Sequence, residues 1–101
     1  MIEIAIFLGE GFAGEGNQFG YREGEKHGLL AFLRQHRGST LNFETAEMEM
    51  ESLGWKQVNF YRASTLTNVE ALNAMHNSAA ASYEDALNNG FAAIVYADPI
   101  E

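Results

Sequence analysis

The chain has 101 residues, 47% of them hydrophobic and 20% charged, and six Lys plus Arg against fourteen Asp plus Glu give it a net charge of -8. This composition is typical of one small globular domain and excludes a disordered chain. The absence of cysteine excludes disulfides, thiolate metal sites and cysteine nucleophiles, and so negative a surface predicts no direct binding to nucleic acid or to anionic membranes.

No apolar run approaches the roughly 20 residues that span a bilayer. The first residues, MIEIAIF, contain none of the basic residues that begin a secretory signal. We therefore expect a cytoplasmic protein with no membrane segment, in which residues 1–101 form a single domain. Secretion by a route without a cleaved signal is the alternative.

Residues 2–8 alternate between two faces, which predicts a strand. One face carries Ile2, Ile4, Ile6 and Leu8, and the other carries Glu3, Ala5 and Phe7. Because both faces are largely apolar, we expect the strand to be covered on both sides and to end at Gly9.

Residues 9–28 contain seven glycines. Each glycine costs about 1 kcal/mol relative to alanine inside a helix. The segment is therefore predicted to be a glycine-rich loop or a loose hairpin, in which residues 19–21 could add a short strand. Loops of this length in a small domain are often functional.

The sequence GEGFAG at residues 9–14 matches the G-x-G-x-x-G fingerprint of dinucleotide-binding proteins. That fingerprint requires the glycines to open into a helix whose N-terminus holds the pyrophosphate. Gly16 and Gly20 argue against such a helix, and Asn17 with Gln18 replaces the Lys and Ser/Thr of a P-loop. We conclude that the match is a false positive and expect no nucleotide cofactor.

From Arg22 to His36 the apolar spacing predicts a helix, with Leu29, Phe32 and Leu33 on one side and Gly38 as its stop. A second helix is predicted over residues 43–53, capped by Asn42 and ended by Gly54. Its apolar face consists of Phe43, Ala46, Met50 and Leu53, and its acidic face of Glu44, Glu47 and Glu51, with Glu49 nearby.

A strand is predicted over residues 55–63. If Val58 and Phe60 face the helices, Trp55, Gln57, Asn59 and Tyr61 face the other way. Two aromatic rings with two amides suit the core of a protein interface, unless the glycine-rich loop covers this face.

Thr67 and Glu70 form a capping box that predicts the start of a third helix, closed by Gly90, and residues 91–98 predict a last strand. We therefore predict an α/β or α+β domain of two layers, with three or four strands and two or three helices. Helical crossovers favour parallel neighbouring strands, and a ferredoxin-like split βαβ arrangement is the alternative.

The sequence offers no catalytic set and no metal site. His27, His36 and His76 lack the spacing of a histidine zinc site, and a straight acidic helix lacks the geometry of a calcium loop. Phe12, Phe19 and Tyr21, set among glycines, are interpreted either as a lid on the core or as a recognition loop for a protein partner.

The leading hypothesis is a small acidic non-enzymatic interaction domain, an inhibitor or immunity-type factor, that docks on a basic protein. Its expected partner-binding residues are Glu44, Glu47, Glu51, Phe12, Phe19, Tyr21, Trp55 and Tyr61. One alternative is a small-molecule binder or enzyme with a pocket under the glycine-rich loop, served by His27, His36 or His76. The other is a homo-oligomer, such as a homodimer, whose sheet face pairs with itself.

Overall fold

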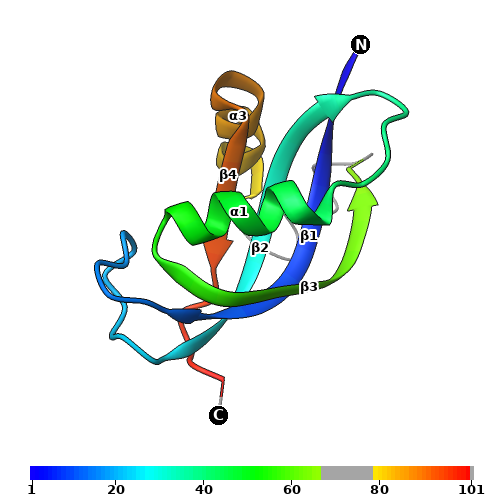
Figure 1. Ribbon diagram of the computed structural model, residues 1–101. Coiled ribbons are helices and arrows are strands. Elements are labelled where there is room, and N and C mark those ends of the chain that lie inside the picture. The colour runs from blue at the N-terminus through cyan, green and yellow to red at the C-terminus, as the bar shows by residue number, and fades with distance from the viewer. Residues whose placement is uncertain (67–78, 101) are drawn as a thin grey trace.

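The computed structural model describes residues 1–66 and 79–100. Four strands form one sheet in the order β3-β1-β2-β4, and every neighbouring pair is antiparallel (Figure 1). The elements in chain order are β1 (Ile2–Ala13), β2 (Lys26–His36), α1 (Phe43–Ser52), β3 (Trp55–Thr65), α3 (Ala79–Asn89) and β4 (Phe91–Val95). Within the described residues, this arrangement confirms the predicted small α+β fold, with a four-stranded sheet and two helices.

The first strand is longer than the alternation predicts, because it continues through Gly9 and Gly11 to Ala13. A Cβ atom on Gly9 would collide with the carbonyl oxygen of Asn59 and lie 2.6 Å from Cα of Phe60. Gly9 therefore does not end β1. It allows the backbone of β3 to approach closely.

The helix predicted over residues 22–36 is wrong, since Lys26–His36 form strand β2. Leu29 to Leu33 are five consecutive apolar residues, a pattern that fits a strand buried on both faces as well as a buried helix. In β2 the odd-numbered members of this run pack on one side of the sheet, and Leu30 and Phe32 pack on the other.

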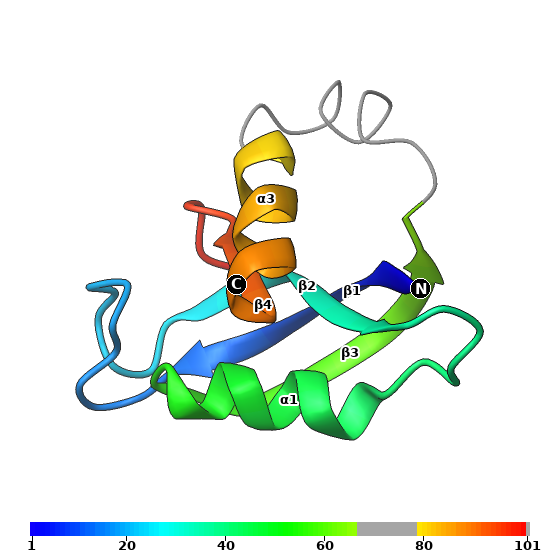
Figure 2. The same cartoon turned by 90° about the horizontal axis from the view of Figure 1, so that it is seen from above.

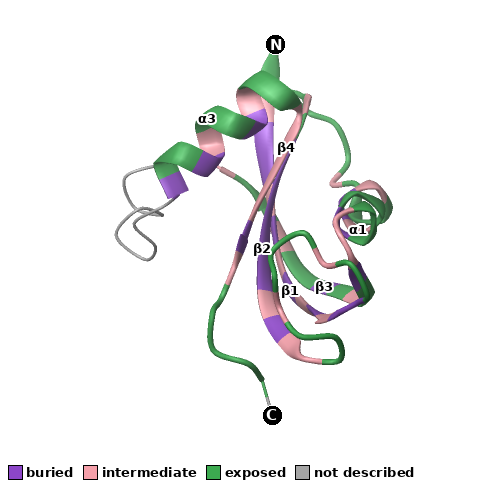
Figure 3. Cartoon of the chain, turned by 90° about the vertical axis from the view of Figure 1, so that its left-hand side faces the viewer, coloured by how far each residue is buried: buried purple, intermediate pink, exposed green. Residues whose placement is uncertain are grey.

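The two described helices, α1 and α3, lie on opposite faces of the sheet (Figure 2), so the described chain forms three layers instead of the expected two. Ala46 and Met50 of α1 pack into one core cluster with Phe7, and Ala79 and Ala86 of α3 pack into a second cluster on the opposite face. The buried residues of β1 and β2 lie between the helices (Figure 3).

The connections explain why the expected parallel neighbours are wrong. β2 and β3 both run antiparallel to β1 and hence in the same direction. Helix α1 thus does join two parallel strands, but β1 lies between them, which makes β2-α1-β3 a split βαβ unit.

Two bulges in β3 decide which of its side chains are buried. Between Leu8 and Gly9 of β1 the register skips Tyr61, and between Glu10 and Phe12 β3 has one residue more than β1. The second bulge includes Gln57, which has a positive φ of 51°. Because an extra residue reverses the alternation of faces, Trp55 packs in the same buried cluster as Phe60. The prediction that Trp55 faces away from the helices is therefore wrong.

Helix α1 begins and ends as the sequence predicts. The side chain of Asn42 accepts a hydrogen bond from the backbone N–H of Thr45 at 3.0 Å, and Gly54 follows the helix with a φ of +97°. The predicted capping box at Thr67 and Glu70, and His76, lie outside the described residues. Among the residues that are described, no helix is long and apolar enough to cross a membrane.

Candidate functional site

The structure separates the residues expected to bind a partner into several places. Phe19, Tyr21 and Trp55 meet under the glycine-rich loop, as a group that we call the aromatic cluster. Phe12 lies on the opposite face of the sheet beside Lys26, and Tyr61 is 61% exposed at a bulge of β3. The side chains of Glu44, Glu47 and Glu51 lie on α1, away from its buried residues.

The aromatic cluster is built around Trp55, which is only 1% exposed. The ring centroids of Phe19 and Tyr21 each lie 6.0 Å from that of Trp55. The ring of His27 is 5.8 Å from Trp55 and 4.1 Å from Tyr21. Phe19 is 39% exposed and forms the outer side of the cluster. The loop aromatics thus cover the core, and Phe19 is also accessible to a partner.

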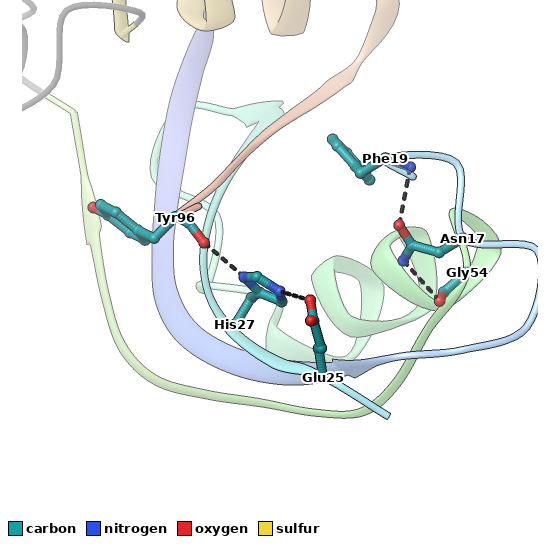
Figure 4. A network of polar contacts seen from close by, with 6 residues as sticks. All are labelled: Asn17, Phe19, Glu25, His27, Gly54 and Tyr96. Atoms are coloured by element: carbon teal, nitrogen blue, oxygen red, sulfur yellow. Dashed lines mark hydrogen bonds and ion pairs between the residues drawn. The ribbon is translucent and has the colours of Figure 1, made fainter. Parts of the chain in front are cut away.

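The glycine-rich loop is shorter than predicted, since residues 9–13 belong to β1 and residues 26–28 to β2, which leaves residues 14–25. It is fastened to the end of α1 by backbone groups and by one amide (Figure 4). The N–H of Gly14 and the side-chain Nδ2 of Asn17 both donate to the carbonyl oxygen of Gly54, at 2.7 and 3.0 Å. Asn17 Oδ1 also accepts from the N–H of Phe19 at 3.0 Å. Asn17 therefore holds Phe19 in place over Trp55, a role that sequence reasoning missed.

Replacing Asn17 with alanine is expected to lower the free energy of unfolding by about 1 kcal/mol, because both side-chain hydrogen bonds are lost. Amide hydrogen exchange of residues 14–25 should become faster than that of β1 and β2. Asn17→Asp is the matched control, since it keeps the acceptor for Phe19 but loses the donor to Gly54. Exchange rates in Asn17→Ala equal to those of the unmodified protein would contradict this role.

His27 is completely buried, with acceptors at both ring nitrogens (Figure 4). Its Nδ1–H donates to the carbonyl oxygen of Tyr96 at 2.8 Å, and Nε2 lies 3.0 Å from Oε1 of Glu25. The two contacts fix the orientation of the imidazole ring. The hydrogen bond to Tyr96 also joins β2 to the chain that follows β4.

The indole Nε1 of Trp55 is buried, and among the described residues it has no hydrogen-bond acceptor. A buried donor without a partner typically costs about 1–3 kcal/mol. It is the feature of the aromatic cluster that packing alone does not explain.

A hollow of about 360 Å³ lies at the other end of the sheet. It is lined by Met1, Ile2, Glu3, Ile4, Arg37, Thr65, Leu66 and Tyr83. None of the aromatic residues predicted to line a pocket contributes to it. Within residues 1–66 and 79–100, no three His, Asp or Glu side chains come together in a way that could hold a metal ion.

Helix α1 carries four glutamates and no basic residue in its last turn. Glu44, Glu49 and Glu51 are exposed and Glu47 is half-buried. In the described part of the chain, none of the four is paired with a cation. We call Glu44, Glu47 and Glu51 the acidic stripe.

Searches against family models, curated proteins and solved structures found no match for this chain.

Proposed function

We propose that this protein is a non-enzymatic cytoplasmic interaction domain, an inhibitor or immunity-type factor, which docks through the acidic stripe of α1 on a basic surface of a protein partner. The observation that carries the proposal is that the stripe works against the stability of its own helix. Glu44 and Glu47 are three residues apart and Glu47 and Glu51 four apart, so neighbouring carboxylates repel one another.

Glu51 also destabilises α1, because a negative charge in the last turn interacts unfavourably with the helix dipole. A lysine there would be favourable, and the chain has no basic residue in that turn. The acidic stripe therefore destabilises α1 and has no cationic partner within the described chain. Neutralisation by another molecule would explain why the stripe is present.

Changing all three residues of the stripe to glutamine should have opposite effects on stability and on binding. Each of the two repulsive pairs costs about 0.2–0.5 kcal/mol, and the dipole contributions of Glu44 and Glu51 have opposite signs and cancel. The free energy of unfolding, measured in urea, is therefore expected to rise by about 0.5–1 kcal/mol. Affinity for the partner should fall at least about tenfold, which corresponds to about 1.4 kcal/mol.

The partner can be sought by pull-down from the native host followed by mass spectrometry. The matched control is Glu15→Gln, Glu23→Gln and Glu84→Gln, which removes the same charge from exposed positions outside α1. A basic protein retained by the unmodified chain and by the control, lost with the stripe variant and released by salt, would support the proposal. Equal retention by both variants would overturn it.

The alternative function, a small-molecule site under the glycine-rich loop, is favoured by the unpartnered Nε1 of Trp55. A ligand with an acceptor oxygen would satisfy this donor beside Phe19, Tyr21 and His27. Trp55 is the only tryptophan, so its fluorescence reports binding directly. A ligand that shifts this emission and protects the loop from hydrogen exchange would favour the alternative over the acidic stripe.

A further inference from the structure

The sheet face turned away from α1 collects most of the cations of this acidic chain. Paired residues of antiparallel strands point to the same side. Lys26 and Lys56 both pair with Phe12, and Arg62 pairs with Leu8. Arg34 pairs with Ile4, which packs under α3. Four of the six Lys and Arg residues therefore lie on the face opposite the acidic stripe.

Two of these four cations, Arg34 and Lys26, already have partners within the chain. Arg34 donates to the carbonyl oxygen of Leu87 at 2.7 Å. Lys26 lies 3.2 Å from a carboxylate oxygen of Glu10 and 5.7 Å from the centroid of the Phe12 ring.

Lys56 and Arg62 are exposed, and in the described chain neither has an ion-pair partner. We call Lys56 and Arg62 the basic patch. Figure 3 shows that α3 and α1 lie on opposite sides of the sheet, so the acidic stripe and the basic patch face away from each other.

We propose that copies of this chain associate head to tail, with the acidic stripe of one copy against the basic patch of the next. The two surfaces match in sign and in length. Glu44 and Glu51 are separated by seven residues of helix, or about 10 Å. Lys56 and Arg62 lie opposite β1 residues four apart, Phe12 and Leu8, which places them about 13 Å apart.

The contact is heterologous, because each copy uses two different surfaces, and it leaves one surface of each kind open at the ends. Exposed ion pairs each contribute little, so we expect a dissociation constant on the order of 1 mM. The inference rests on the acidic stripe as a docking surface, and it adds a second copy as an occupant of that surface.

The proposal is tested by reversing the charge of each surface and measuring association by sedimentation velocity. The ionic strength is about 0.1 M, where the Debye length of about 10 Å screens the repulsion between whole molecules. The stripe variant is Glu44→Lys, Glu47→Lys and Glu51→Lys. The patch variant is Lys56→Glu and Arg62→Glu. We expect the unmodified chain to associate, each variant alone to lose association about tenfold, and an equimolar mixture of the two to associate again.

Matched controls change the same charge elsewhere on the surface. Arg22→Glu with Arg37→Glu, and Glu15→Lys, Glu23→Lys with Glu84→Lys, leave both surfaces intact and should associate like the unmodified chain. Circular dichroism shows whether each variant is folded. A mixture of the stripe and patch variants that stays monomeric, or an unmodified chain that is monomeric at about 1 mM, overturns the proposal.

Other occupants of the basic patch are separate outcomes of the same experiment. A glutamate decapeptide or a single-stranded oligonucleotide that shifts the NMR signals of Lys56 and Arg62, while the chain itself stays monomeric, assigns the patch to another anion and overturns the proposal. The patch variant also separates this proposal from the proposed function. If it still retains the basic partner in a pull-down but does not differ from the unmodified chain in self-association, only the head-to-tail contact fails.

Discussion

Replacing Trp55 with alanine is expected to lower the free energy of unfolding by about 4 kcal/mol. Trp55 is the largest of the fully buried side chains, and its ring contacts Phe19, Tyr21 and His27. The substitution therefore removes apolar burial and leaves a cavity where β3, β2 and the glycine-rich loop meet. Urea unfolding measures the loss, and hydrogen exchange should show the greatest loosening in residues 14–25.

Tyr61→Ala is the matched control for this experiment. Both residues are large aromatics on β3, but Tyr61 is 61% exposed and Trp55 only 1%. We expect the control to change the free energy of unfolding by less than about 0.5 kcal/mol. Similar losses for the two substitutions would contradict the reversal of faces that the bulges produce.

Replacing Gly9 with alanine is expected to cost about 3 kcal/mol or more, which is the upper end for overpacking a core. The added methyl group would meet the carbonyl oxygen of Asn59 and the Cα of Phe60. These are backbone atoms of a paired strand, so relief requires β3 to move away from β1. Thermal unfolding should show a correspondingly lower midpoint.

Gly11→Ala provides the comparison within the same strand and on the same face. Its methyl group would lie 3.0 Å from Cδ1 of Leu29 and 3.3 Å from Cγ2 of Val58, and these side-chain atoms need to move by only a few tenths of an ångström. The loss should therefore be about 1 kcal/mol. Equal losses at Gly9 and Gly11 would show that close approach of the β3 backbone is not what requires Gly9.

Local signals were sufficient to predict α1. Asn42 caps the helix by accepting a hydrogen bond from Thr45, three residues away, and Gly54 ends it in a backbone conformation that favours glycine. The buried residues of the helix, Ala46 and Met50, belong to the apolar face that the spacing predicts. In β2 the local signal was ambiguous, because an uninterrupted apolar run has no period that separates strand from helix. Its pairing with β1 along the whole of its length decided the outcome, and that pairing is a long-range contact.

The aromatic cluster was predictable in part. The sequence singled out Phe19, Tyr21 and Trp55, and the structure brings them together. It did not reveal the contacts of His27, because one of its two partners, the carbonyl group of Tyr96, is distant in sequence. Net charge was also a poor guide to individual surfaces. The basic patch depends on strand register, which two bulges in β3 determine.

The bulges also affect β3 as an edge strand of the sheet. Among the described strands β3 pairs only with β1, so it forms an edge of the sheet that is eleven residues long. A straight edge of that length is a template for fibril growth and irreversible aggregation. The bulges at Gln57 and Tyr61 interrupt its regular hydrogen-bonding pattern, and Lys56 and Arg62 place charge beside them. The long edge strand β3 is thus poorly suited to pairing with strands of other molecules.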